Sequence, residues 1–339
     1  MAIALSRRKF LSLAAGAGAA AVTGGLGVWA WFGRSEGLQE ARSTGWALGA
    51  EVTLLALHRR RAAAQEAVEA AFGELARVER VMSLYRPDSQ LVRLNRDGVL
   101  EQPDADLVAA LRTAGEMSLR SGGAFDATVQ PLWTAYAQAD RRGSLPEASA
   151  VEEALGRVGW QGVDVTAGRI RLARPGMAVT LNGIAQGLAA DRVLAVLGDH
   201  GVEHALVNTG EIGSMGRKSD GRPWTVGVQH PRRPEEYVAL ASLDGRCMAT
   251  SGDYETRFGE GFDNNHIFDP ATGQSPTAFS SVTVLADRGV DADAISTAVF
   301  VMGPEKGLQL VRSTPRADAM LVFKDGRTLA TEGFPGAKS

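Results

Sequence analysis

A carboxylate and a hydroxyl near the end of the sequence are spaced so that both could bind one hard metal ion. Asp293 and Thr297 lie in a segment whose apolar residues recur at helical spacing up to Met302. One helical turn separates them, so both side chains lie on one stripe of oxygen donors, the ligands that Mg²⁺ prefers. The alternative is that Asp291 or Asp293 caps this helix and Thr297 bonds to its own backbone.

A second segment could bring backbone N–H groups close to a phosphate. Residues 181–187 read Leu-Asn-Gly-Ile-Ala-Gln-Gly, and Gly183 and Gly187 flank the expected start of a helix. N–H groups at such a junction favour anions. The segment is neither a Rossmann nor a P-loop motif, and glycines at a turn also serve backbone conformation alone.

Two further segments could hold a flat ring and polar groups. Phe125 and Asp126 directly follow a predicted helix, and they could hold a ring and bond to its edge, or be a buried aromatic and a capping carboxylate. The motifs Thr-Ser-Gly-Asp-Tyr at 250–254 and His-Ile-Phe-Asp-Pro at 266–270 place polar groups on two loops. The Asp-Pro pair of the second motif also indicates a turn.

The elements that must position these residues are short and mixed. Hydrophobic periodicity predicts helices over 62–82, 104–120, 146–158, 184–197 and 292–302. Strands are predicted over 51–58, 205–207, 224–228 and 238–241, as a pair over 163–170 and 177–181, and as a closing hairpin over 319–323 and 327–330. This order lacks the regular alternation of a doubly wound sheet, so we expect an α+β fold with interleaved strands and helices, forming one domain over residues 40–335.

The composition excludes several other classes of protein. The 339 residues are 45% hydrophobic and 22% charged, typical of a globular chain with a large core. A formal net charge of -3 gives no basic surplus, so we expect no nucleic acid partner. The single cysteine, Cys247, excludes an internal disulfide and a multi-cysteine zinc site.

The N-terminus indicates export. Ser-Arg-Arg-Lys-Phe-Leu at residues 6–11 precedes an apolar run rich in Ala and Gly. We interpret residues 1–33 as a twin-arginine signal segment and expect a periplasmic protein. A membrane-spanning helix is the alternative, although the run is poor in Leu and Ile. An uncleaved segment would leave the protein anchored.

Taken in order, the chemical motifs resemble the ApbE family of FAD:protein FMN transferases. The resemblance runs from about Trp46 to the C-terminal hairpin and rests on Gly-Ala-Phe-Asp at 123–126, the 181–187 segment, the 251–254 and 266–270 motifs, and the Ala-Asp-Ala helix ending in Thr297. It implies transfer of the FMN moiety of FAD to a Thr or Ser hydroxyl of a target protein. Mg²⁺ would be the cofactor and AMP the leaving group.

The resemblance also assigns roles to residues of this chain. It implies Gly183, Asp293 and Thr297 as metal ligands and places His266 beside the diphosphate. Because the attacking hydroxyl must lose a proton, a base is also needed, and we name His266 or Asp253 for that catalytic role. The FAD-binding residues that the resemblance implies are Leu48, Tyr85, Ala124, Phe125, Asp126, Thr180, Gln186 and Ile267.

Three departures from the family pattern point to one branch of it. Many members carry Asp at the position of Thr180 and Lys or Glu at that of Gln186, so two charged FAD contacts become neutral here. The segment 208–212 is shorter than the usual double-glycine version. With the twin-arginine signal, these variants resemble the NosX branch, so the implied partner is a flavin-accepting membrane component that serves electron transfer or nitrous oxide reduction.

Two other functions fit the same residues. In a Mg²⁺-dependent FAD pyrophosphatase, water replaces the protein hydroxyl and free FMN and AMP leave. A periplasmic flavin carrier would hold FAD without cleaving it. The pair Asp293 and Thr297 argues against a carrier, because a carrier needs no metal at the pyrophosphate.

Overall fold

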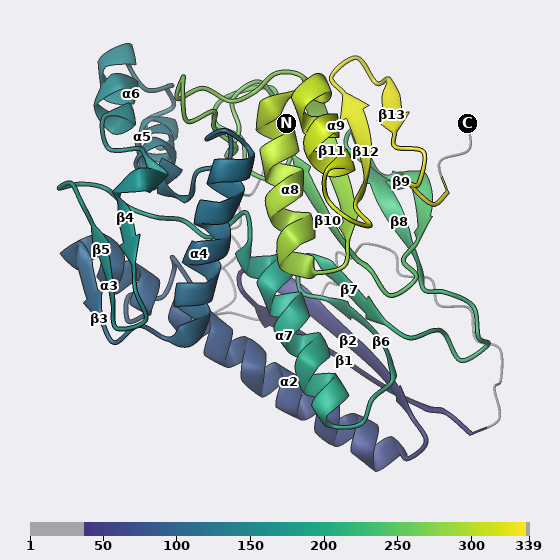
Figure 1. Ribbon diagram of the computed structural model, residues 1–339. Coiled ribbons are helices and arrows are strands. Elements are labelled where there is room, and N and C mark those ends of the chain that lie inside the picture. The colour runs from purple at the N-terminus through teal and green to yellow at the C-terminus, as the bar shows by residue number, and fades with distance from the viewer. Residues whose placement is uncertain (1–36, 337–339) are drawn as a thin grey trace, which may run out of the picture.

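An eight-stranded antiparallel sheet forms the centre of the molecule (Figure 1). The computed structural model describes residues 37–336, so the predicted signal segment lies outside the described residues. In spatial order the strands are β1 (Gln39–Ala47), β2 (Ala50–His58), β6 (His204–Asn208), β7 (Ile212–Met215), β10 (Cys247–Gly252), β11 (Phe279–Ala286), β12 (Asp318–Phe323) and β13 (Thr328–Ala330).

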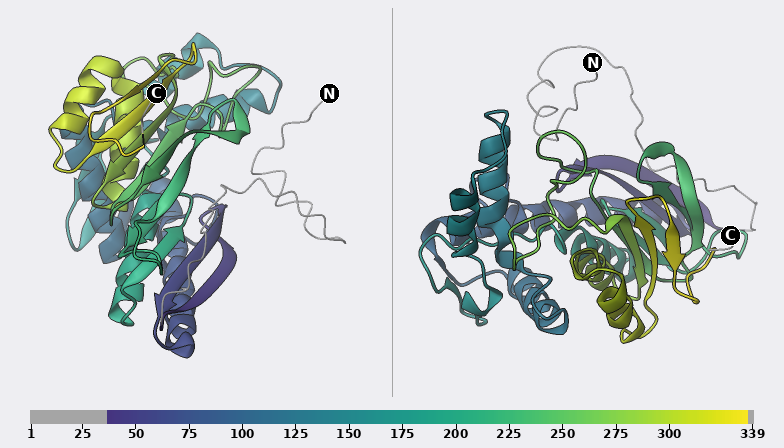
Figure 2. Two further views of the ribbon diagram at one scale, coloured as in Figure 1. Left: turned by 90° about the vertical axis from the view of Figure 1, so that its right-hand side faces the viewer. Right: turned by 90° about the horizontal axis from the view of Figure 1, so that it is seen from above.

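Helices cover one face of this sheet and a hairpin covers the other (Figure 2). The helices are α2 (Arg61–Met82), α7 (Ala185–Asp199), α8 (Gly289–Met302) and α9 (Pro304–Arg312), and the hairpin is β8 (Thr225–His230) with β9 (Arg233–Ser242). Most residues of α8 are buried, as expected for a helix that is apolar on all of its faces. The hairpin buries Trp224 against the opposite face.

A second, mainly helical lobe packs beside the sheet (Figure 1). It contains α3 (Gln90–Asp97), α4 (Ala105–Arg120), η1 (Ala127–Val129), α5 (Gln130–Asp140), α6 (Ala148–Leu155), η2 (Trp160–Gly162) and a small sheet of β3 (Val99–Glu101), β5 (Arg169–Leu172) and β4 (Val163–Val165). Phe258 and Phe268, from the loop after β10, join the small core of α5 and α6. The expected α+β class with interleaved elements is confirmed.

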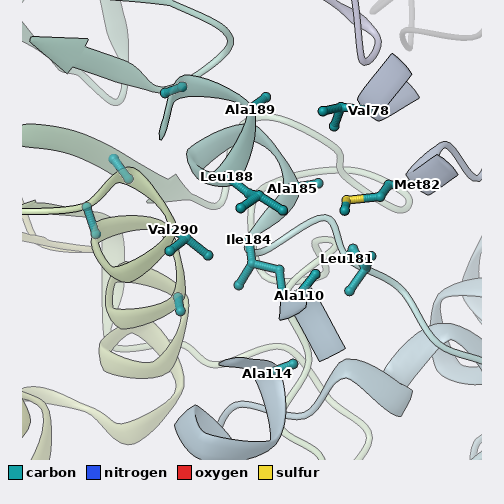
Figure 3. Close-up of a cluster of buried hydrophobic side chains, with 14 of the residues drawn as sticks. Val78, Met82, Ala110, Ala114, Leu181, Ile184, Ala185, Leu188, Ala189 and Val290 are labelled. Carbon is teal, nitrogen blue, oxygen red and sulfur yellow. The ribbon is translucent and has the colours of Figure 1, made fainter. Parts of the chain in front are cut away.

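The segment that leads into α7 is buried in the main hydrophobic core. Ile184 precedes the helix and is completely buried. Figure 3 shows it surrounded by apolar side chains from α2, α4 and α8, namely Val78, Met82, Ala110, Ala114 and Val290. This packing fixes where the 181–187 segment lies relative to α8.

α7 and α8 cross at two glycines. A Cβ added to Gly187 would overlap the carbonyl oxygen of Gly289 and lie 2.8 Å from Asp293 Cβ. A Cβ on Gly289 would overlap the carbonyl oxygen of Gly187. Only residues without a side chain let the two backbones approach this closely.

The N-terminus of α8 is capped from α7. The Asp191 carboxylate accepts hydrogen bonds from the backbone N–H of Gly289 (2.6 Å) and of Val290 (3.0 Å). The alternative prediction of a cap at Asp291 or Asp293 is therefore wrong. Two of the N–H donors at this helix end are satisfied by a carboxylate from another helix.

The predicted strand over residues 177–181 is also wrong. β4 pairs with β5 instead. The Val179 N–H donates to Asn95 Oδ1 (2.7 Å), and Asn95 Nδ2 donates to the Val179 carbonyl (2.8 Å), so a side-chain amide satisfies the backbone in place of a partner strand. The alternation of Met177, Val179 and Leu181 reflects burial rather than sheet pairing.

Gly187→Ala should destabilise the protein, because the added methyl group would force α7 and α8 apart. Overpacking of this kind costs about 1–3 kcal/mol, and urea denaturation of the full chain measures it. Gly115→Ala in α4 is the matched control, since nothing lies within 4 Å of its Cβ position. That exchange should stabilise the protein by about 0.5 kcal/mol or more, and similar effects of the two substitutions would contradict the close crossing.

Candidate active site

A cavity of about 760 Å³ opens between the helical lobe and the main sheet. The β1–β2 turn, the start of α7, α8, the end of β10 and the loop after β10 contribute to its wall. The volume is in the range of cofactor-sized ligands. Every residue implied by the sequence except Asp253 lines it: Leu48, Tyr85, Ala124, Phe125, Asp126, Thr180, Gly183, Gln186, His266, Ile267, Asp293 and Thr297.

One wall of the cavity combines the first turn of α7 with α8. Gly187 N–H donates to Asp293 Oδ2 at 3.0 Å. One turn away, a Cβ on Gly183 would lie 3.0 Å from Thr297 Oγ1. The two segments therefore pass each other in antiparallel directions, and the three residues implied as metal ligands are brought together.

The Asp293 carboxylate is buried beside another carboxylate. Loss of water on burial and, to a smaller extent, the charge of Asp191 raise the pKa of Asp293, the hydrogen bond from Gly187 lowers it, and the net result is a pKa of about 7. Within residues 37–336, none of the charges that shift this pKa is a cation. A bound cation would favour the ionised carboxylate.

The donors on this wall fit a magnesium ion that also uses substrate oxygens. Asp293 and Thr297 offer one carboxylate and one hydroxyl, and Gly183 adjoins them. The described part of the chain contains no group of three or more His, Cys, Asp or Glu residues that could hold a metal. Mg²⁺ is commonly bound by one or two carboxylates and completed by phosphates.

Thr297 is linked to β10 through hydroxyl groups. Ser251 Oγ lies 3.0 Å from Thr297 Oγ1 and 2.8 Å from Ser296 Oγ. Ser296 Oγ in turn donates to the Asp293 carbonyl at 2.9 Å. The sequence prediction included the 251–254 motif but assigned no role to either serine.

Leu48 and Tyr85 lie at the rim of the cavity. Leu48 has a φ of 53° in the two-residue turn between β1 and β2, and its N–H donates to Glu79 Oε1 at 3.2 Å. Tyr85 is 55% exposed, and its N–H donates to Ser83 Oγ at 3.1 Å. A hydrogen bond to α2 and one to the nearby Ser83 side chain thus hold the backbone of these two residues at the opening.

Asp126 lines the cavity, but its carboxylate is occupied. Oδ1 accepts from the Thr128 N–H (2.7 Å) and hydroxyl (2.6 Å), and Oδ2 accepts from the Trp160 N–H (2.9 Å). Burial raises the pKa of Asp126, and these hydrogen bonds lower it. The Asp126 carboxylate thus caps η1, as in the alternative interpretation, whereas Phe125 is buried and also lines the cavity, so its contact with a ring stays a prediction.

An acidic residue of the wall was missed from the sequence. Glu211 lines the cavity, and its Oε2 accepts from the Thr250 N–H at 3.0 Å. The neighbouring Gly210 has a φ of 101° and packs directly against the Gln186 amide. Tyr254 lies in the same wall, and its pKa is raised by burial and by the charges of Glu255 and Glu211. The sequence feature that could have indicated Glu211 is the 208–212 segment, because Glu211 lies within it.

His266 has the geometry of a candidate base. Its side chain lines the cavity, and Nδ1 lies 3.4 Å from the Thr256 carbonyl, which also accepts the His266 backbone N–H at 3.1 Å. A proton on Nδ1 would leave Nε2 as the basic nitrogen.

Asp253 does not have that geometry, which contradicts its predicted role as the base. It is completely buried outside the cavity wall, between Arg232 (2.7 and 2.8 Å) and Lys324 (2.7 Å). Arg232 also lies 3.7 Å from the centre of the Phe262 ring. Both carboxylate oxygens are held by these cations away from the cavity, so Asp253 anchors the loop that carries His266.

Known proteins resemble this chain in sequence and in fold. The sequence model described as the ApbE family matches residues 48–321. A Treponema pallidum protein named FAD:protein FMN transferase is 35% identical over 289 residues, covering 79% of this chain and 80% of the relative. An Escherichia coli K12 protein of the same name is 29% identical over 275 residues, covering 77% and 78%.

Two solved structures share the fold. The flavin transferase ApbE from Vibrio cholerae superposes with a TM-score of 0.78 at 25% identity, covering 88% of this chain and 98% of that one. The ApbE protein of Thermotoga maritima superposes with a TM-score of 0.78 at 28% identity, covering 87% and 97%.

Asp253→Asn should lower the stability of the protein strongly. The amide would leave Arg232 and Lys324 without their shared carboxylate, and breaking a buried ion pair costs about 3–5 kcal/mol. Thermal and urea unfolding measure the loss. Asp97→Asn, in an exposed pair with Arg96, is the control and should leave the midpoint unchanged; an Asp253→Asn protein as stable as this control would show that the pair is not structural.

Asp293→Asn should make the metal-free protein more stable at pH 8. The pKa of Asp293 is higher in the folded state, so the carboxyl contributes stability that is present below about pH 4 and lost as the pH rises through about 7. The amide keeps an acceptor for Gly187 without the charge, and the gain should be roughly 1–3 kcal/mol. Urea unfolding in chelator at pH 5 and pH 8 measures it. If the free energy of unfolding differs between variant and parent by the same amount at both pH values, that result would contradict the raised pKa of Asp293.

Proposed function

The chain belongs to the ApbE family, and from this premise we propose that it is a FAD:protein FMN transferase. Relatives matched over more than three quarters of their length have that name. The proposed reaction moves the FMN half of FAD to a Thr or Ser hydroxyl of another protein and releases AMP. The observation that carries it is the meeting of Gly183, Asp293 and Thr297 on the wall of a cavity of about 760 Å³.

The proposed reaction exchanges one phosphorus–oxygen bond for another. The acceptor hydroxyl oxygen attacks the phosphorus of the FMN half, the bond from that phosphorus to the bridging oxygen breaks, and AMP leaves with the bridging oxygen. The hydroxyl proton passes to a base. His266 is the base we propose, because it lines the cavity and an imidazole is the side chain that most often serves as a general base.

We assign Mg²⁺ to Asp293, Thr297 and Gly183. The buried Asp293 carboxylate and the Thr297 hydroxyl, which line the same cavity, support this assignment. When bound there, Mg²⁺ would neutralise the negative charge that develops on the phosphates. The N-terminal end of α7 lies on the same wall and adds the positive end of its dipole.

Apolar residues elsewhere on the wall suit the uncharged rings of FAD. Thr180 and Gln186 are neutral, and Thr180 Oγ1 already accepts from the Asn182 N–H at 3.2 Å. Thr180 and Gln186 therefore add no charge to the binding of the dinucleotide. The residues proposed to contact the rings are Leu48, Tyr85, Ala124, Phe125 and Ile267.

We also propose a periplasmic location and a membrane-bound acceptor in electron transfer or nitrous oxide reduction. The support is the twin-arginine pattern at residues 6–11 and the neutral Thr180 and Gln186. Across residues 37–336, no helix is long and apolar enough to span a bilayer.

Incubation of the full chain with FAD, Mg²⁺ and a flavoprotein domain bearing an acceptor Thr should add one FMN phosphoester to that domain and release AMP. Intact-mass analysis detects the product. Chelator should stop the reaction, and Asp293→Asn should slow it by about 100-fold, whereas Gly115→Ala should keep the parent rate.

Other products would support the other functions. Free FMN and AMP without labelling, with several acceptor domains tried, would indicate a pyrophosphatase. Bound, intact FAD without AMP would indicate a carrier.

A further inference from the structure

Three hydroxyls and one carbonyl form a continuous line from the backbone of α8 to the cavity. Ser296 Oγ lies 2.9 Å from the Asp293 carbonyl oxygen, Ser251 Oγ lies 2.8 Å from Ser296 Oγ, and Thr297 Oγ1 lies 3.0 Å from Ser251 Oγ. Ser296 is 0% and Ser251 9% exposed. The line therefore runs almost entirely through the protein interior.

The hydrogen atoms along this line have one consistent arrangement. A carbonyl oxygen only accepts, so Ser296 gives its single hydroxyl hydrogen to the Asp293 carbonyl. Ser296 Oγ can then only accept, which makes Ser251 its donor. Ser251 has then used its own hydrogen, so Thr297 is the donor to Ser251. The Thr297 hydrogen is thereby directed toward β10.

This direction leaves lone pairs of Thr297 Oγ1 for a ligand. A hydroxyl binds a cation through a lone pair, and its hydrogen repels one. The oxygen adjoins Gly183 and the side chain lines the cavity. We infer that Ser251 and Ser296 are positioning residues that orient the Thr297 hydroxyl for a divalent cation, an inference that rests on the proposed function.

Removing the Ser296 hydroxyl, which is fixed by the Asp293 carbonyl, should reverse the direction of the hydrogen bond between Ser251 and Thr297. In Ser296→Ala, Ser251 loses its acceptor, so its hydrogen can turn to Thr297 Oγ1 and occupy a lone pair. Affinity for a divalent cation should then fall, although Ser296 does not line the cavity. Loss of a residue that orients a metal ligand typically lowers affinity by about 10- to 100-fold.

The test measures metal binding to the full chain directly. Mn²⁺ is the probe, followed by loss of the free-ion electron paramagnetic resonance signal, with Mg²⁺ as competitor and with and without FAD. Ser296→Ala should raise the Mn²⁺ dissociation constant by about tenfold. Thr283→Val is the matched control, because it removes another buried hydroxyl contact between β10 and β11, the 2.9 Å contact with Thr250. Its affinity should stay within about twofold of the parent's.

A double variant separates orientation from simple structural damage. In Ser251→Ala with Ser296→Ala, no serine can donate to Thr297, so the double variant should bind Mn²⁺ more tightly than Ser296→Ala alone. A purely structural role would make the double variant the weakest. That result, or a folded Ser296→Ala protein with parent-like affinity, would overturn the inference and leave the proposed metal site standing. A parent protein that binds neither ion, with or without FAD, would overturn both.

Discussion

The site depends on the close crossing of α7 and α8. Glycines let the two backbones touch, and each helix supplies a carboxylate to the other, Asp191 to the start of α8 and Asp293 to Gly187. The turn before α7 is held by hydrogen bonds from the Ile184 and Ala185 N–H groups to the Leu181 carbonyl and by the buried Ile184 side chain, so fixing Gly187 against Asp293 also places Gly183 against Thr297. Two segments that are distant in sequence thereby form one wall of the cavity.

Buried carboxylates serve two different purposes in this molecule. Asp253 lies between Arg232 and Lys324, so its charge is balanced within the protein, and it holds the loop after β10. Burial raises the pKa of Asp293, and the neighbouring Asp191 raises it further. No cation among residues 37–336 balances this charge, so the carboxylate does not serve stability. Its position at a cavity wall is better explained by the binding of a ligand. The contrast separates the structural carboxylate from the one available to a metal.

The sequence predicted the parts of this arrangement that depend on local periodicity. α2 and α8 follow from apolar spacing, and the one-turn separation of Asp293 and Thr297 follows from α8. β11 was missed because its Ser and Thr residues break the apolar pattern, although the whole strand is buried. The false strand over 177–181 has the right alternation, but Asn95 satisfies its backbone. Asp253 was misassigned because nothing nearby in the sequence reveals its two distant cations.

A metal site to which only one carboxylate, Asp293, is assigned depends on the orientation of its neutral ligands. A site with several carboxylates attracts a cation mainly by charge, whereas a hydroxyl or carbonyl contributes only when its lone pair already faces the ion. Here the packing of Ile184 holds Gly183 in place, and β10 holds the Thr297 hydroxyl through Ser251. The ligand-bearing segments are therefore correctly arranged only when the sheet, α7 and α8 are packed together. Affinity for a cation would then be a property of the tertiary structure and not of any one motif.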